Sequence, residues 1–209
     1  MKNLDLTLYA VTDRACLKGR NLHEAVRAAL RGGVTLVQLR EKDMPIDEYI
    51  REAKAIKKIC REFCVPLLID DNVEVCIKAD ADGVHLGQSD MPCGEARRLL
   101  GDTKIIGVTA KTIEQAKAAQ EMGADYLGSG AVFGTSTKAD AVKMDMETLK
   151  SICASVSIPV CAIGGINKDN VRELKGSGIS GAAIVSGIFG NTDTENAARE
   201  LRCIMEEIL

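Results

Sequence analysis

The chain has 209 residues, of which 46% are hydrophobic, which is enough for one sizeable core and too few for two ordinary domains, so we expect a single domain over residues 1–209. Its 27 Lys and Arg residues against 30 Asp and Glu residues leave a formal net charge of −3, which excludes a general basic surface for nucleic acid or for an anionic membrane. No apolar run approaches the roughly 20 residues that a membrane-spanning helix needs.

Short apolar or β-branched runs alternate along the chain with segments of helical periodicity, which is typical of parallel βαβ units. In chain order, we predict strands near 6–12, 34–39, 65–70, 82–87, 104–109, 125–130, 158–163 and 181–186. We predict helices near 22–31, 47–63, 73–79, 93–100, 112–122, 145–154, 168–175 and 194–208. Several of these helices open with Asp, Thr or Asn and close near glycine, as helix capping favours.

Eight strands in alternation with eight helices favour an α/β fold of one class, the single-domain (β/α)8 TIM barrel. The competing fold is an open doubly wound sheet, which normally has a glycine-rich turn after its first strand. Here that turn reads Thr12-Asp13-Arg14 and has no GxGxxG pattern, so the barrel is preferred. The longest connection, 131–144, is rich in Thr, Ser, Gly, Lys and Asp, and we expect it to cover a bound ligand.

The cysteines and histidines do not form a recognisable site in the sequence. The eight cysteines show no CxxC spacing and no signal peptide is recognised, so a reducing cytoplasm is the expected location. Cys60 and Cys64 lie four residues apart on a predicted helix, but no histidine completes a zinc pattern, and buried thiols are favoured. His23 and His85 are interpreted as structural, because no catalytic triad can be assembled from them.

Polar residues and glycines follow every predicted strand, at the end of the barrel where such enzymes place their active sites. These residues are Asp13; Arg40 and Lys42; Asp70 and Asp71; Gln88 and Asp90; Thr109 and Lys111; Thr135, Ser136, Thr137 and Lys138; Gly164 and Gly165; and Ser186 and Gly187. Four of them, Arg40, Lys42, Lys111 and Lys138, are cations on one rim of an acidic protein. This segregation predicts a phosphorylated, polyanionic ligand, and the alternative is a solvated charged rim.

Two aspartates, Asp71 and Asp90, follow neighbouring strands, whose spacing allows two carboxylates to reach one ion. Mg2+ characteristically takes one or two carboxylates together with waters and phosphate oxygens, so the pair suits a magnesium-diphosphate site. The spacing is equally compatible with two aspartates that cap the helices after their strands.

Glycines follow the last two predicted strands, in the segments 163–166 (IGGI) and 185–188 (VSGI). These segments resemble the phosphate site of barrel enzymes, where backbone N–H groups bind a phosphomonoester. The glycines could instead only make tight turns. Two distinct anion positions imply either one bisphosphate or two separate phosphorylated substrates.

Seven segments resemble those of the thiamine-phosphate synthase family, and together they extend over nearly the whole chain. They are YAVTD at 9–13, QLREK at 38–42, ADGVHLGQSD at 81–90, GVTAKT at 107–112, ADYLGSGAVFGTSTK at 124–138, AIGGI at 162–166 and IVSGI at 184–188. The resemblance implies that hydroxymethylpyrimidine diphosphate condenses with a thiazole phosphate, carboxylated or not, by Mg2+-assisted dissociative loss of diphosphate. The product would be thiamine phosphate. The implied partners are these small molecules, and a homo-oligomer is compatible with the sequence.

The resemblance also implies roles for individual residues. Arg40, Lys42 and Lys138 would stabilise the departing diphosphate, and Asp71 and Asp90 would hold Mg2+. The residues expected to contact the pyrimidine diphosphate or the thiazole phosphate are Gln38, Leu39, Arg40, Glu41, Lys42, Asp70, Thr109, Thr135, Ser136, Thr137, Lys138, Gly165, Val185 and Ser186.

Three positions depart from the usual pattern of that family. Asp70 stands where Asn is common, Thr109 where Ser is common, and Lys111 where His often occurs. Thr109 keeps the hydroxyl group, whereas Asp70 changes a group expected to recognise the pyrimidine. Two alternative functions remain open from the sequence: a related thiazole tautomerase, which needs no diphosphate-binding set, and a non-catalytic sensor of phosphorylated ligands.

Overall fold

A computed structural model of the chain describes residues 4–134 and 143–209. Eight parallel strands form a closed barrel, in which each strand pairs with the next along the chain and the last pairs with the first. The strands are β1 Leu8–Val11, β2 Leu36–Leu39, β3 Leu67–Asp70, β4 Gly83–Leu86, β5 Ile105–Thr109, β6 Tyr126–Gly130, β7 Val160–Ile163 and β8 Gly181–Ile184.

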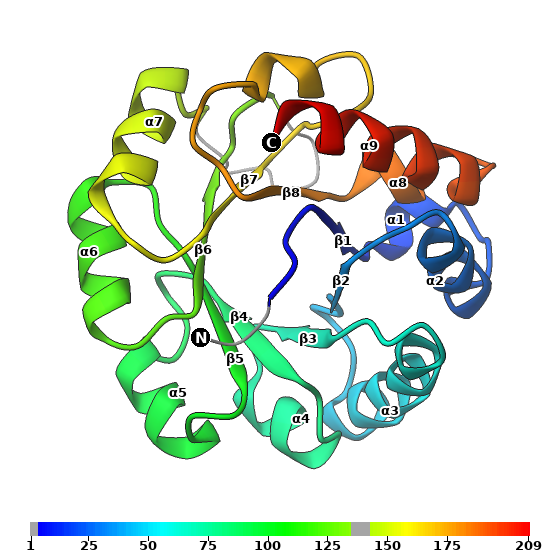
Figure 1. The fold of residues 1–209 in the computed structure, drawn as a ribbon. Helices are drawn as coiled ribbons and strands as arrows, with labels where there is room; N and C mark the ends of the chain where they lie inside the picture. Colours follow the sequence, from blue (N-terminus) through cyan, green and yellow to red (C-terminus); the bar gives the residue numbers. More distant parts are fainter. Residues whose placement is uncertain (1–3, 135–142) are drawn as a thin grey trace.

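Helices surround this barrel as an outer ring, as Figure 1 shows. They are α1 Arg14–Leu17, α2 Leu22–Arg31, α3 Ile46–Glu62, α4 Val73–Lys78, α5 Cys93–Leu100, α6 Ile113–Glu121, α7 Met146–Ser155, the 3-10 helix η1 Val171–Leu174, α8 Ser186–Phe189 and α9 Thr194–Ile208. No helix in the described part of the chain combines the length and the apolar character that a membrane span requires.

The predicted α/β fold, a single-domain (β/α)8 TIM barrel, is confirmed, and all eight predicted strands are present. The helix predicted over 168–175 is wrong, because only the short 3-10 helix η1 forms there. Asn170 Oδ1 accepts from the backbone N–H of Asn167, and Asn167 Oδ1 accepts from that of Asp169. Such local side-chain bonds favour a turn over a continuous α-helix.

Two short helices and one strand end also differ from the prediction. The four-residue helices α1 and α8 follow β1 and β8 directly, and neither is predicted from the sequence. Strand β8 ends at Ile184, so Ser186 begins α8 where the sequence indicates the last residue of a strand. A helix of one turn is too short for a hydrophobic repeat, which is why periodicity does not detect it.

Side chains on each strand alternate between two apolar layers. On β1, Leu8 and Ala10 pack in the layer between strands and helices, whereas Tyr9 packs inside the barrel. Leu36 and Leu68 also pack inside the barrel, and each stands two residues before a polar residue of the same strand. An apolar plug therefore fills the amino end of the barrel interior, and polar side chains begin above it.

Candidate active site

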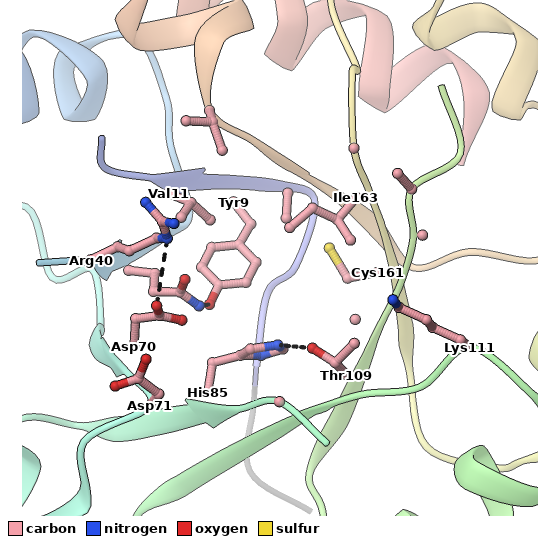
Figure 2. A pocket seen from close by; sticks show the side chains of 18 of the residues that line it. Tyr9, Val11, Arg40, Asp70, Asp71, His85, Thr109, Lys111, Cys161 and Ile163 are labelled. Atoms are coloured by element: carbon pink, nitrogen blue, oxygen red, sulfur yellow. Dashed lines mark hydrogen bonds and ion pairs between the residues drawn. The ribbon is translucent and has the colours of Figure 1, made fainter. Parts of the chain in front are cut away.

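A cavity of about 560 Å³ opens at the carboxyl ends of the strands, above the apolar plug. Figure 2 shows side chains from several strands and from the loops after them converging on it. The lining residues that belong to the predicted rim are Arg40, Lys42, Asp70, Asp71, Gln88, Asp90, Thr109, Lys111, Gly164, Gly165 and Ser186. Residues that are far apart in the sequence thus share one site, as the barrel prediction requires.

Arg40 is held between two carboxylates at one side of this cavity. Its Nη1 lies 3.1 Å from Oδ2 of Asp13, and its Nε lies 3.6 Å from Oδ2 of Asp70, the contact drawn in Figure 2. The backbone N–H of Arg40 donates to the hydroxyl of Thr12 at 3.0 Å. These contacts hold the guanidinium at the wall of the cavity, which Lys42 also lines.

Asp70 is largely withdrawn from solvent, with its side chain 17% exposed, although it carries an ionisable group. Burial and, to a smaller extent, the nearby carboxylate of Asp71 raise the pKa of its carboxyl to about 6, against the opposing effect of Arg40 and Lys42. The ion pair with Arg40 would by itself lower this pKa. Because the contact is long at 3.6 Å, burial and like charge prevail over it.

Asp71 and Asp90 lie close enough to influence each other. Burial raises the pKa of Asp71 above its usual value, and the charge of Asp90 raises it further. Asp71 has a φ of +56°, and its backbone N–H donates to the carbonyl of His85 at 2.8 Å. Asp90 Oδ2 accepts from the backbone N–H of Gly87 at 2.6 Å, which holds the loop after β4.

The alternative that these two aspartates cap helices is wrong. Helix α4 is capped by Asn72, whose side chain accepts from the N–H of Val75, and the N-cap of α5 is Pro92. The donor set is compatible with a magnesium ion, because both carboxylates line the same cavity and the charge of Asp90 acts on the carboxyl of Asp71. Mg2+ prefers such an incomplete site, because waters and phosphate oxygens complete its coordination.

The opposite side of the cavity is made of backbone from the loops after β7 and β8. Gly165 has a φ of +67°, and a Cβ atom there would lie 2.2 Å from the carbonyl oxygen of Gly134. Val185 and Ser186 line the cavity where α8 begins. Gly165 therefore makes a tight turn and also borders the cavity, and its binding of a phosphate group stays a prediction.

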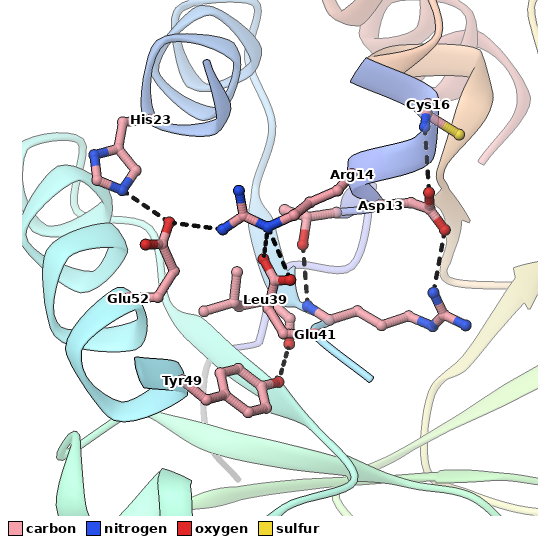
Figure 3. Close-up of polar contacts among 10 residues, drawn as sticks. Asp13, Arg14, Cys16, His23, Leu39, Glu41, Tyr49 and Glu52 are labelled. Atoms are coloured by element: carbon pink, nitrogen blue, oxygen red, sulfur yellow. Dashed lines mark hydrogen bonds and ion pairs between the residues drawn. The ribbon is translucent and has the colours of Figure 1, made fainter. Parts of the chain in front are cut away.

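Two residues expected to contact substrate do not line this cavity. Leu39 packs in the layer between strands and helices, and its carbonyl accepts from the hydroxyl of Tyr49 at 2.7 Å. The carboxylate of Glu41 accepts from Nε of Arg14 at 2.7 Å, and Figure 3 shows Arg14 between Glu41 and Glu52. Alternation along β2 explains Leu39, since Gln38 and Arg40 line the cavity on either side of it. The predicted residues Thr135, Ser136, Thr137 and Lys138 lie outside the described residues.

Some cavity residues are not predicted from the sequence. Tyr9, His85 and Cys161 point to the interior from β1, β4 and β7, together with Ile163 and Val11. His85, which the sequence indicates as structural, contacts both Tyr126 and Thr109. The period of two along each strand could have identified these positions, because residues two apart face the same side of the barrel wall.

Comparisons with known proteins agree on one family. A family model described as thiamine monophosphate synthase matches residues 8–188. The thiamine-phosphate synthase of Clostridium tetani is 48% identical and covers 99% of both chains, and that of Clostridium acetobutylicum is 47% identical over 99% of this chain and 98% of its own. The structure of thiamine phosphate pyrophosphorylase from Pyrococcus furiosus superposes with a TM-score of 0.91 at 43% identity, over 99% of this chain and 98% of that one.

Proposed function

The chain belongs to the thiamine monophosphate synthase family, and from this premise we propose how its residues divide the work of forming thiamine phosphate. The enzyme is a transferase of thiamine biosynthesis with small-molecule substrates. We infer that it joins the methylene carbon of a pyrimidine diphosphate to the nitrogen of a thiazole phosphate. The carrying observation is one cavity that has cations and carboxylates on one side and glycine backbone on the other.

Arg40, Lys42 and Lys138 act on the diphosphate in this proposal. When the bond between the methylene carbon and oxygen breaks, the electron pair leaves with the diphosphate and its negative charge grows. Cations that are already in position stabilise this charge without reorganisation. The two carboxylates around Arg40 support the assignment for that residue, because they hold its guanidinium at the cavity wall. Lys138 is included on the family resemblance.

Asp71 and Asp90 would hold Mg2+, which supplies positive charge beside the diphosphate when it is bound. The support is the donor set itself. The charge of Asp90 raises the proton affinity of Asp71 on the neighbouring loop, as the raised pKa of Asp71 indicates. A divalent ion between them would remove that repulsion.

Loss of diphosphate leaves the methylene carbon as a cation that is delocalised over the aminopyrimidine ring. Gln38, Asp70 and Thr109 are assigned to the pyrimidine. The lone pair of the thiazole nitrogen then forms the new carbon–nitrogen bond, so no side-chain nucleophile and no proton transfer is needed. The phosphate of the thiazole is assigned to Gly165, Val185 and Ser186, together with residues 135–137.

The two alternatives from the sequence are not supported. A thiazole tautomerase needs no diphosphate-binding set, whereas Arg40, Lys42, Asp71 and Asp90 all line this cavity. A non-catalytic sensor would not need the paired carboxylates. The curated relatives cited above are named as synthases.

We also infer a reducing compartment such as the cytoplasm for this enzyme. The support is that the eight cysteines are free thiols, several of them buried in the core. Proteins of oxidising compartments commonly use their cysteines in disulfides.

The test is a direct assay with the purified protein. The protein is incubated with the pyrimidine diphosphate, the thiazole phosphate and Mg2+, and thiamine phosphate is detected by fluorescence after oxidation. We expect equal amounts of thiamine phosphate and diphosphate, and no product after chelation of the metal. Diphosphate release without thiamine phosphate would contradict the proposal, and so would product formation that chelator does not change.

A further inference from the structure

A continuous chain of hydrogen bonds crosses the interior of the barrel beneath the cavity. Nε2 of Gln38 donates to the hydroxyl of Tyr9 at 2.6 Å, and this hydroxyl lies 2.9 Å from that of Tyr126. The Tyr126 hydroxyl lies 2.8 Å from Nδ1 of His85, whose Nε2 lies 3.0 Å from Oγ1 of Thr109. We call these five residues the interior relay. They come from five different strands, and Figure 2 shows the contact between His85 and Thr109.

The barrel is built around the relay. Tyr9 and Tyr126 are buried, with their rings edge to face at a centroid distance of 6.0 Å. A Cβ atom on Gly107 would lie 2.1 Å from the Tyr126 ring, and one on Gly128 would lie 2.9 Å from Cε1 of His85. Two strands therefore provide glycine where a larger residue would displace a relay member.

The buried members of the relay are neutral. Burial raises the pKa of both tyrosine hydroxyls far above the usual value, so each keeps its single proton. A buried hydroxyl proton needs an acceptor, and a hydroxyl that receives one hydrogen bond from a neighbour directs its own proton to the next group. The bonds of the relay are consequently not independent of one another.

The amide group of Gln38 sets the direction of the chain. When Nε2 of Gln38 donates to Tyr9, the hydroxyl of Tyr9 donates to that of Tyr126. The hydroxyl of Tyr126 then donates to Nδ1 of His85, and the Nε2–H of His85 donates to the hydroxyl of Thr109. The Thr109 hydroxyl proton is then available to the cavity. If the amide is turned over, every bond reverses, and Thr109 must donate to His85 instead.

An aminopyrimidine distinguishes these two directions. The exocyclic amino group of the pyrimidine requires an acceptor, which is the side-chain carbonyl oxygen of Gln38. The two N–H bonds of the Gln38 amide then donate to the pyrimidine ring nitrogen and to the hydroxyl of Tyr9. The direction that follows leaves the hydroxyl of Thr109, which lines the cavity, free to donate to an oxygen that gains negative charge there.

We propose that His85 is a positioning residue, which transmits recognition of the aminopyrimidine by Gln38, through Tyr9 and Tyr126, to the hydroxyl of Thr109. Thr109 then donates into the cavity when the correct pyrimidine is bound. The relay thereby links the identity of the base to the chemical step. This inference rests on the proposed function.

The tautomer of His85 tests the direction of the relay. The chain has two histidines, so protein labelled with 15N-histidine shows two imidazoles, and the surface variant His23→Gln assigns the other one. In the complex with the pyrimidine diphosphate and Mg2+, we expect a neutral His85 ring that carries its proton on Nε2. Its Nδ1 is then unprotonated and accepts from the hydroxyl of Tyr126. A proton on Nδ1 in that complex, in either a neutral or a charged ring, would overturn the proposal.

A double-mutant cycle tests the link to the chemical step. Tyr126→Phe keeps the ring but removes the hydroxyl, at a residue separated from Thr109 by His85. We expect it to lower kcat about tenfold, the worth of one hydrogen bond, in the parent but less than twofold in a Thr109→Val background. Thr109→Ser, which keeps a hydroxyl, should retain the sensitivity to Tyr126→Phe. Effects that simply multiply in the double variant would overturn the relay.

The two experiments separate this inference from the proposed function. If the parent forms thiamine phosphate and the cycle is multiplicative, only the relay fails. If the parent forms no thiamine phosphate, the proposed function fails first. The tautomer measurement needs no substitution in the relay, so it remains decisive if Tyr126→Phe does not fold.

Discussion

The two ends of the barrel use ionisable side chains in opposite ways. At the amino end, Asp80 receives hydrogen bonds from Nζ of Lys104 at 2.7 Å and from Nζ of Lys57 at 2.9 Å, and these bonds hold the pKa of its carboxyl well below the usual value. At the carboxyl end, burial and like charge raise the pKa values of Asp70 and Asp71. At the amino end, hydrogen bonds from lysines prevail over burial, whereas at the carboxyl end burial and like charge prevail over the contacts of Asp70 and Asp71 with cations.

This difference indicates a separate role for each end. At the amino end, acidic side chains have partners within the protein: Arg97 pairs with Asp125 at 2.7 Å, and Asp82 accepts from the N–H of Leu67 at 2.8 Å. Its charges connect loops to strands and contribute to stability. Under the proposed function, the carboxyl end takes its partners from ligands, which are a cation for its carboxylates and an anion for its cations.

The largest effect on activity is expected from the paired carboxylates. Asp71→Ala and Asp90→Ala should each abolish most turnover, because each removes a carboxylate from the proposed magnesium site. Binding of thiazole phosphate should survive in both variants. The measurement is kcat of chelator-treated enzyme against titrated Mg2+, with Asp102→Ala, an exposed acid at the amino end, as the control. Two variants with parental activity would remove the metal assignment.

The cations of the same end should give the next largest effect. Arg40→Ala and Lys138→Ala should lower the single-turnover rate by about 10² to 10³, the range for loss of one positioned donor to a developing negative charge. Arg31→Ala, which removes a surface guanidinium paired with Glu195, is the matched control and should leave the rate unchanged. If Arg40→Ala and Lys138→Ala keep the parental single-turnover rate, neither residue acts in the chemical step.

The sequence predicted the barrel and most of its rim because both follow from local patterns. Runs of apolar residues mark strands, and residues such as Arg40 and Asp71 stand directly after them. Interior positions such as Tyr9 and His85 were missed, because only residues at the strand ends were assigned to the site and the period of two was not followed back along each strand. Glu41 lies in the same motif as the cavity residues Arg40 and Lys42, but its carboxylate accepts a hydrogen bond from Arg14 and does not line the cavity. This contact joins two loops that are distant in the sequence, so a local motif does not predict it.

The helix predicted over 168–175 shows a second limit of sequence interpretation. Its composition permits a helix, but the amide side chains of Asn167 and Asn170 bond the neighbouring backbone. The free-energy difference between a helix and such a turn is small, and it depends on contacts with Gly165 at the cavity that a local pattern does not contain.

Asp70 offers a test of the comparison through stability. A carboxyl whose pKa is raised to about 6 in the folded state binds its proton more tightly than in the unfolded chain. Its contribution to stability is therefore complete below about pH 4, and it is lost as the pH rises through about 6. Asp70→Asn, which has no such titration, should be more stable than the parent above pH 6, by at most about 3 kcal/mol. Thermal unfolding in Mg2+-free buffer from pH 4 to pH 8 measures this gain.

The same substitution has a consequence for substrate binding. An amide can donate and accept, as recognition of an aminopyrimidine requires, whereas an ionised carboxylate only accepts. Asp70→Asn should therefore preserve or improve the KM for the pyrimidine diphosphate near neutral pH, and the difference from the parent should narrow as the pH falls. A tenfold loss of affinity at every pH between 5.5 and 8.5 would show instead that this carboxylate has a role of its own.

The smallest effect is expected at the amino end, from Asp80→Asn. The Asp80 carboxylate partners Lys57, whose side chain is only 7% exposed, so the substitution leaves a buried ammonium with a weaker partner, Asp82 at 3.9 Å. Because the folded state lowers the pKa of Asp80, its stabilisation is present above the pKa of the unfolded chain and is lost as the pH falls below it. We expect the free energy of unfolding to fall by on the order of 1 kcal/mol at pH 7, or Tm by roughly 2 to 4 °C. This loss should shrink toward pH 3, while kcat stays at the parental value.

Asp102→Asn at the same end is the control, and its Tm should follow the parent at every pH. A fall in kcat for Asp80→Asn with no change in Tm would contradict the division of the barrel into a stabilising end and a reactive end, since it would place an amino-end acid in the chemistry.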